Sequence, residues 1–314
     1  MKVSSAIGVL SAMNAIARGE IASDSDLVES SRPFVCAPLA REEQFAAWRE
    51  LLTKGTHISA ALNFLREAGW LGRYPELERL VGCRQDPQWH PEGDVWQHTL
   101  CCLNAFAADR GKRRAGDDED LIVGLAVLCH DLGKPFCTSY DPVRKRIRSL
   151  GHDERGVGPT VEFLRRITDD ERLLAEVPPL VRLHMRPFAM WRDNASDGAI
   201  RRVMRQVGRI DRLIRVAAAD DAGRPPFPSE PEPLVWLERA SARIAAEDSV
   251  PAPLVRGRHL LAMGMRPGPA FKRILDAAYA AQLEGCFQDL ASALAFVSSL
   301  DLKTESHSAC GGDF

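Results

Sequence analysis

A histidine and an aspartate stand side by side where a long apolar segment ends. Residues 126–136 read AVLCHDLGKPF, so His130 and Asp131 follow directly on the run LIVGLAVLC, which is typical of a buried helix. Burying an unpaired imidazole or carboxylate is strongly unfavourable. The pair therefore requires a partner, which could be a salt bridge, a hydrogen-bond network or a metal ion.

More histidines and aspartates occur in neighbouring segments. His98 lies in VWQHT, His152 in GHDERG and His184 in LVRLHM, while the segment AAADDAGR contains Asp220 and Asp221. The apolar stripe of the preceding helix continues to Asp220 at helical spacing, which favours Asp220 as the inward-facing aspartate. Asp221 is the alternative.

Each histidine taken alone is explained more simply as a core residue with a hydrogen-bond partner. Taken together, these side chains project from successive helices, which is how helix bundles build metal sites. Mixed imidazole and carboxylate ligands favour Mn, Fe, Co, Ni or Zn over Ca or Mg. We therefore expect one or two divalent transition-metal ions, with the candidate ligands His98, His130, Asp131, His152, His184 and Asp220.

Composition excludes several classes of protein. The 314 residues are 45% hydrophobic and carry a formal net charge of −2, which excludes a strongly basic nucleic-acid binder but not a local basic patch. Eight cysteines without a C-x-x-C spacing favour reduced thiols over a disulfide framework. No apolar run reaches the roughly 18 residues of a membrane span. We expect a cytoplasmic protein that does not associate with membranes.

The remaining pattern predicts helix after helix, and hence an all-α bundle with flanking helical segments. Asp94 is placed to cap the helix that contains His98, residues 138–151 read as a polar loop, and residues 197–221 read as one long helix. The expected organisation is an N-terminal helical segment 1–88, a central domain 89–224, a linker 225–233, a C-terminal helical segment 234–302 and a disordered tail 303–314.

The motifs VWQHT, CHDLGK and AAADDAGR resemble the three-part signature of the HD-domain phosphohydrolases. The resemblance implies that His98, His130, Asp131 and Asp220 hold one metal ion. It further implies that His152 and His184 hold a second ion, with Asp131 shared between the two.

A closer resemblance is to the HD domain of bacterial CCA-adding enzymes, the tRNA nucleotidyltransferases. It is carried by QDPQWHPEGDVWQHTL, CHDLGKP and GHDERGV, and segments 51–77 and 254–285 resemble the neck, body and C-terminal parts of those enzymes. The resemblance covers roughly residues 35 to 300. Residues 1–40 contain no Gly-rich turn leading into paired aspartates, so we expect no nucleotidyltransferase head and no nucleotide addition.

If two ions share Asp131, they activate a water molecule for attack on phosphorus. Lys134, just past the ligand pair, is a candidate for binding the phosphate or assisting the leaving group, and Arg155 and Arg186 are candidate phosphate ligands. The simpler roles are a favourable charge at a helix C-terminus for Lys134 and pairing with nearby acidic residues for the two arginines.

The resemblance implies 2′,3′-cyclic phosphodiesterase, 2′-nucleotidase or phosphatase activity on nucleotides or RNA 3′ ends, with tRNA as a possible partner. The alternative is a non-catalytic RNA-binding module, with RRVMRQVGRIDRLIR as its basic face, or a partner subunit of a separate nucleotidyltransferase. An ordinary solvated helix face explains the same arginines more simply.

Overall fold

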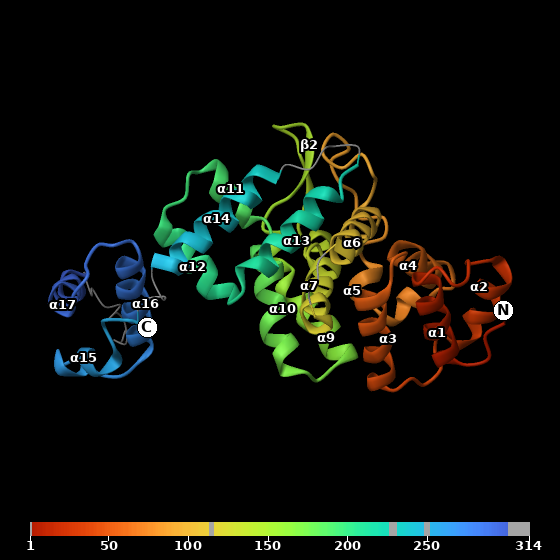
Figure 1. The fold of residues 1–314 in the computed structure, drawn as a ribbon, viewed down its shortest axis with the longest axis horizontal. Helices are drawn as coiled ribbons and strands as arrows, with labels where there is room; N and C mark the ends of the chain where they lie inside the picture. The colour runs from red at the N-terminus through yellow and green to blue at the C-terminus, as the bar shows by residue number, and fades with distance from the viewer. Residues whose placement is uncertain (1, 113–115, 226–230, 248–251, 301–314) are drawn as a thin grey trace, which may run out of the picture. The chain divides into compact units, whose positions relative to one another are not determined.

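The computed structural model describes residues 2–112, 116–225, 231–247 and 252–300. Within those residues nearly all regular structure is helical, and the one sheet is a two-stranded antiparallel hairpin (Figure 1). The all-α prediction is therefore confirmed. None of the described helices is both long and apolar enough to cross a membrane.

The chain divides into two compact units. The first comprises Met1–Asn194 and Val203–Ser241, and the second comprises Ala195–Arg202 and Ala242–Phe314. The first unit begins with α1 (Ala6–Ala17), α2 (Ser25–Ser31), η1 (Arg32–Phe34), α3 (Arg41–Lys54), α4 (Ile58–Glu67), η2 (Trp70–Arg73) and α5 (Pro75–Glu78). It continues with α6 (Val95–Lys112), α7 (Asp117–Cys129), η3 (Lys134–Phe136), β1 (Thr138–Asp141), β2 (Arg146–Ser149), α8 (His152–Arg155), α9 (Val157–Ile167), α10 (Glu171–Leu183), α11 (Arg186–Arg192) and α13 (Ile210–Ala222).

Helix α7 is the centre of the first unit. It packs against α3, α6, α10 and α13, and every residue from Leu121 to Cys129 is buried (Figure 1). Gly124 permits close packing, because a Cβ atom there would lie 3.0 Å from the Phe106 ring. Four acidic residues in the first turn stabilise the positive end of the helix dipole. The apolar run identified in the sequence thus forms the buried helix that ends at His130.

The predicted long helix over 197–221 is wrong, because the structure has two helices there. Helix α12 (Asp197–Val207) ends just before Gly208, whose φ of 68° is the left-handed conformation that glycine adopts readily. Helix α13 then begins at Ile210 and carries Asp220 in its last turn.

The predicted polar loop over 138–151 is also wrong in part, because it contains the hairpin. Strands β1 and β2 pair with Tyr140 opposite Ile147 and Asp141 opposite Arg146. The Asp141 carboxylate accepts hydrogen bonds from the backbone N–H groups of Val143 and Arg144, which closes the turn. The strands are only four residues long, so their alternation is too brief to distinguish from a loop.

The arginines of α12 and α13 do not form one exposed basic face. Arg212 is buried and binds Glu119 and Glu176, and Arg215 is buried and binds Asp120. These ion pairs hold α13 against α7 and α10. Arg212 and Arg215 therefore belong neither to an RNA-binding surface nor to a solvent-exposed helix face, and both interpretations are wrong for these two residues.

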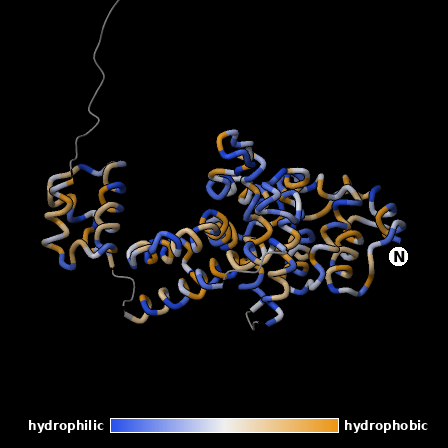
Figure 2. Tube along the Cα trace, turned by 90° about the horizontal axis from the view of Figure 1, so that it is seen from above, coloured by the Kyte–Doolittle hydropathy of each residue, from blue (hydrophilic) through white to orange (hydrophobic). Residues whose placement is uncertain are grey.

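The second unit has its own small core. Helices α15 (Gly257–Ala262), α16 (Pro269–Leu283) and α17 (Leu290–Ser299) pack around buried apolar residues that include Leu260, Ile274 and Val297. Apolar and polar residues alternate along the helices of both units (Figure 2). Helix α14 (Pro231–Glu247), shared by the two units, begins inside the proposed linker 225–233. Residues 226–230 of that linker and the proposed tail 303–314 lie outside the described residues.

Candidate metal centre

Helices α6 and α13 bring His98 and Asp220 together. The predicted cap of α6 is confirmed, because the Asp94 carboxylate accepts a hydrogen bond of 2.9 Å from the Gln97 N–H. Four residues into the helix, His98 is fully buried, and its Nε2 lies 3.0 Å from Oδ1 of Asp220. The end of α13 can approach α6 closely because residue 223 is glycine, where a Cβ atom would lie 2.3 Å from the Cys102 sulfur.

The buried helix α7 presents the next pair. The Nδ1 of His130 lies 2.8 Å from the Val127 carbonyl and donates to it in the neutral tautomer, so Nε2 is left to face the cluster. That Nε2 lies 3.2 Å from Oδ2 of Asp131. Asp131 also has its Oδ1 3.4 Å from Nε2 of His152. The carboxylate therefore lies between the histidines of α7 and α8.

His152 and His184 repeat the arrangement of His130. In each residue Nδ1 lies close to the backbone carbonyl oxygen three residues earlier. The distance is 2.8 Å from His152 to Ser149 and 2.6 Å from His184 to Val181. Their two Nε2 atoms lie 3.3 Å apart. Three histidines thus present Nε2 to the same small volume, with their rings oriented by backbone hydrogen bonds. This is the usual orientation of metal-binding histidines.

Three groups of donor atoms among the described residues could each hold a metal ion: one comprises His90, Glu92 and His98, and the other two contain the proposed ligands. Of these two, the first contains His98, Cys102, His130 and Asp220, and the second contains Asp131, His152 and His184. Asp131 adjoins the first group as well, because its Oδ2 lies 3.7 Å from Nε2 of His98. Among the described residues, Nε2 of His130 and both oxygens of Asp131 are buried without a well-formed hydrogen bond, and Asp131 is ion-paired with Lys134. Imidazole and carboxylate donors gathered in this way fit a divalent cation.

The electrostatics of the cluster also favour bound positive charge. Burial lowers the pKa of His184 to about 4, with further lowering by His130, so this imidazole is neutral at pH 7. Burial also opposes protonation of His130, but the Asp131 carboxylate outweighs it and raises the pKa of His130 to about 10. The pKa of Asp220 is lowered against the effect of burial, chiefly by its hydrogen bond to His98. Without a metal, protons on histidines therefore offset the buried carboxylates.

A loop residue that the sequence analysis missed supports this centre. Oε1 of Glu92 lies 2.8 Å from Nδ1 of His98 and 2.8 Å from Nδ1 of His90. Burial favours protonation of Glu92, but the two histidine hydrogen bonds lower its pKa to about 2. The carboxylate orients the His98 ring so that Nε2 faces the cluster. The order His-x-Glu just before the capped helix was a signal available in WHPEGDVWQH.

The predicted phosphate ligands lie in different places. Lys134 is buried beside the cluster, with its Nζ 2.6 Å from Oδ2 of Asp131 and 2.7 Å from Oε1 of Gln85. Arg155 is exposed and donates to the Phe136 carbonyl, and Arg186 is exposed at the start of α11. A hollow of about 590 Å³ adjoins the histidine cluster, and neither arginine lines it. The structure therefore does not bring these two residues to the cluster.

The two candidate aspartates of α13 have different surroundings. Asp220 lies against His98, whereas the buried Asp221 is ion-paired with Arg224. This arrangement supports the prediction that Asp220 is the ligand.

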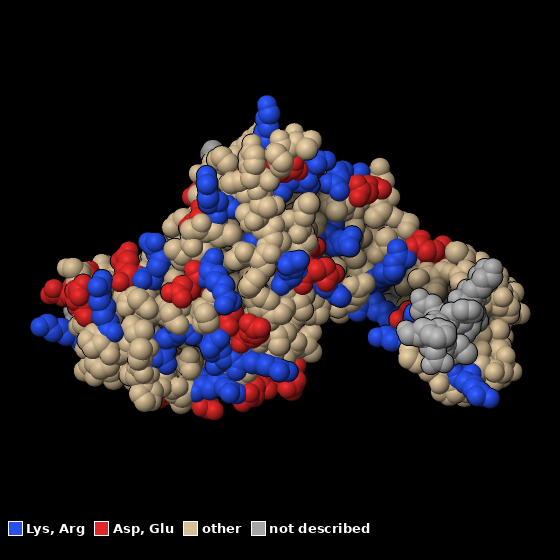
Figure 3. Space-filling model, turned by 180° about the vertical axis from the view of Figure 1, so that it is seen from behind, with Lys and Arg blue, Asp and Glu red and all other residues tan. Residues whose placement is uncertain are grey.

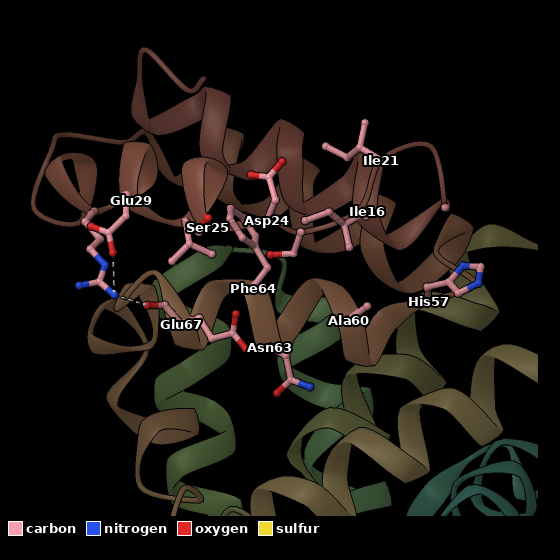
Figure 4. Close-up of a pocket in the computed structure, with 15 residues that line it drawn as sticks. Ile16, Ile21, Asp24, Ser25, Glu29, His57, Ala60, Asn63, Phe64 and Glu67 are labelled. Carbon is pink, nitrogen blue, oxygen red and sulfur yellow. Dashed lines mark hydrogen bonds and ion pairs between the residues drawn. The ribbon is translucent and has the colours of Figure 1, made fainter. Parts of the chain in front are cut away.

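The cluster opens to solvent through a hollow of about 590 Å³, which we call the histidine hollow. Asp131, His152, His184 and Asp220 line it, together with Trp89 and several arginines. A second hollow of about 810 Å³ lies among α1, α2 and α4 (Figure 4). Its titratable residues include the ion pair of Glu29 with Arg32, and they form no group of metal donors. Donor chemistry rather than size therefore identifies the candidate site.

Comparisons with known proteins agree with the tRNA-enzyme resemblance. No family model matches the chain. An A-adding tRNA nucleotidyltransferase of Deinococcus radiodurans is 29% identical over 280 residues, which is 87% of this chain and 60% of the relative. A multifunctional CCA protein of Alkalilimnicola ehrlichii is 34% identical over 210 residues, covering 63% and 47% respectively. One from Acinetobacter baumannii is 28% identical over 199 residues, covering 60% and 44%.

The chain is homologous to tRNA nucleotidyltransferases. Because the matches span 44% to 60% of these relatives, the activities of the whole relatives do not transfer directly to this chain.

Proposed function

We propose that this chain is an HD-type, metal-dependent phosphohydrolase. Its substrates are ribose 2′- or 3′-phosphoesters, including 2′,3′-cyclic phosphates of nucleotides or RNA 3′ ends. The observation that carries the proposal is the cluster of four histidines and two aspartates, of which Asp131, His152, His184 and Asp220 line an open hollow. The choice of ribose phosphates rests on the homology with tRNA enzymes.

Divalent ions bound at the two donor groups would lower the pKa of a water molecule and offset the charge of a phosphate. His98, His130 and Asp220 would hold one ion, His152 and His184 the other, and Asp131 would contribute to both. In hydrolysis of a cyclic phosphate, water adds to phosphorus while one P–O bond to ribose breaks. The product is a ribose monophosphate, and the freed ribose oxygen takes up a proton.

Lys134 is suited to two tasks in such a reaction. Its ammonium group lies against Asp131, so it orients that carboxylate and keeps it ionised. It also lines the histidine hollow, where a charged donor can bind a phosphate oxygen. We propose Lys134 as the phosphate-binding residue nearest to the reacting atoms. Arg155 and Arg186 remain proposed phosphate ligands only for a substrate that extends beyond the hollow.

The proposal is tested by metal analysis and a substrate screen. The purified chain is supplied separately with Mn, Fe, Co, Ni and Zn and offered 2′,3′-cyclic nucleotides, ribose phosphomonoesters and RNA with a 3′-phosphate. We expect at least one metal to support release of phosphate or ring opening. Failure of every combination would refute the substrate class while leaving the metal centre to be judged by metal content.

A double variant tests the centre itself. His130→Ala/Asp131→Ala should abolish metal binding and turnover, because it removes one ligand of the first group and the carboxylate that adjoins both groups. His57→Ala is the matched control, since this histidine is exposed and lines the distant hollow. Unchanged metal content and turnover in the double variant would show that the site is assigned wrongly.

A further inference from the structure

A third hollow adjoins the histidine hollow. It has a volume of about 570 Å³ and lies between loop residues 84–88 and the β1–β2 hairpin; we call it the hairpin hollow. Asp86, Arg146 and Ile147 line both hollows, so the two are neighbours with a common wall. A substrate bound at the histidine cluster could therefore extend directly into the hairpin hollow.

The common wall contains a cation with an unsatisfied donor. The Nε of Arg146 is buried, and among the described residues it has no hydrogen-bond partner. The nearby Asp141 carboxylate is used by other groups, since it pairs with Arg144 and Arg148. A guanidinium is always charged, and Arg146 is half-buried and lines both hollows. Its charge is thus placed to bind an anion at the junction of the two hollows.

The lining of the hairpin hollow is suited to a nucleotide. It contains the basic residues Arg84, Arg144, Lys145 and Arg146, against the single acidic residue Asp86. Basic side chains also occur on the projecting end of the unit that carries the hairpin (Figure 3). Tyr140 lines the same hollow and is 61% exposed, although large aromatic side chains are usually buried. Exposed aromatic rings beside basic groups are how proteins bind single-stranded nucleic acids.

We propose that the hairpin hollow is a subsite for the nucleotide on the 5′ side of the reacting ribose phosphate. Arg146 binds the phosphodiester that joins the two nucleotides, and Tyr140 stacks on the base. The preferred substrate is then the 3′ end of an RNA strand rather than a free mononucleotide. This inference rests on the proposed function, because the histidine cluster defines where the reacting phosphate lies.

The kinetic test compares two substrates that differ only in length. The kcat/KM is measured for a 2′,3′-cyclic mononucleotide and for a trinucleotide that ends in the same cyclic phosphate. We expect the trinucleotide to be preferred at least tenfold, and Arg146→Gln or Tyr140→Ala to reduce this preference at least fivefold. Tyr140→Phe should retain it, because the phenyl ring still stacks. Equal use of both substrates, or a preference that survives both variants, would overturn the inference and spare the proposed function.

A binding test separates the subsite from the chemistry. Fluorescence anisotropy of a 5′-labelled RNA hexanucleotide with a 3′-phosphate is measured with metal-free protein, for which we expect at least fivefold weaker binding in both variants. Val143→Ala, at the tip of the hairpin, and Arg165→Gln, exposed on α9, are the controls and should leave binding unchanged. Variant-sensitive binding without turnover would refute the proposed function alone. Binding that is absent or insensitive to both variants would refute the subsite.

Discussion

Histidine orientation is the feature of the centre that individual residues control. His130, His152 and His184 each have Nδ1 against the carbonyl three residues earlier, whereas Nδ1 of His98 is bound by Glu92. Hydrogen bonds of this kind fix the ring and the tautomer, and they make Nε2 a better ligand. His98 depends on a side chain for this support, so its orientation can be altered without disturbing the backbone.

Glu92→Ala should therefore weaken metal binding by about ten- to a hundredfold while all the predicted ligands remain. The metal dissociation constant, measured by competition with a chelator, is the appropriate readout. Glu154→Ala is the control, because this exposed carboxylate follows His152 closely but does not line the histidine hollow. Normal metal affinity in Glu92→Ala would contradict the supporting role of this residue.

The pKa of His130 makes the stability of the metal-free protein depend on pH. Its folded pKa is raised to about 10, chiefly by Asp131 acting against burial, and its unfolded pKa is about 6.5. Between these values the folded state binds more protons than the unfolded state, so the free energy of unfolding falls as pH rises from about 6.5 towards 10. Urea unfolding across this range in a chelator should show the decrease. His130→Gln should reduce it, and an equal slope in wild type and variant would contradict the assignment.

At the scale of elements, the centre depends on close contact between the turn after α7 and helix α8. A Cβ atom on Gly133 would lie 2.0 Å from the His152 carbonyl oxygen and 2.6 Å from the Gly156 nitrogen. Both are backbone atoms, so any side chain at this position must separate the two elements. The glycine in HDLGKP is thus required by packing, and it sets the distance between Asp131 and His152.

Gly133→Ala should displace His152 from Asp131 and cost about 1–3 kcal/mol of stability through overpacking. We expect fewer metal ions per chain and lower turnover, together with a lower Tm. Gly158→Ala is the matched control, since α9 leaves open space around that position and helices favour alanine over glycine. Wild-type metal content and Tm in Gly133→Ala would show that the contact is unimportant.

At the scale of the whole molecule, every proposed metal ligand lies in the first compact unit. Residues 1–40 of this unit contain α1 and α2, followed by the short η1. The nucleotidyltransferase head of CCA-adding enzymes contains a strand with paired aspartates. Residues 2–40, as the structure describes them, contain no such strand.

We expect the 314-residue chain not to incorporate CTP or ATP into tRNA that lacks its CCA end. The assay uses radiolabelled nucleotides with Mg²⁺ or Mn²⁺, and a curated relative such as the Alkalilimnicola ehrlichii CCA protein serves as the positive control. Template-independent addition by the pure chain would refute the prediction. The outcome does not affect the metal centre, which is tested separately.

Features that depend on neighbours within a few residues were predictable from the sequence. The helical periodicity, the Asp94 cap and the adjacency of His130 and Asp131 at a helix end are all of this kind. The break at Gly208 and the hairpin were also encoded locally, but a single glycine and four-residue strands are weak signals. The proposed metal ligands could therefore be identified from the sequence, although their contacts could not.

Which side chains meet depends on packing between elements that are far apart in the sequence. His98 and Asp220 are 122 residues apart in sequence, and whether Asp220 or Asp221 faces His98 depends on how α13 packs on α6. Arg212 and Arg215 read as surface residues, but packing of α13 against α7 buries both against acidic partners. The position of Arg146 between two hollows likewise follows from packing of the hairpin beside loop residues 84–88. The periodicity of a sequence indicates which face of one helix is buried. A site depends in addition on how several helices are placed relative to one another.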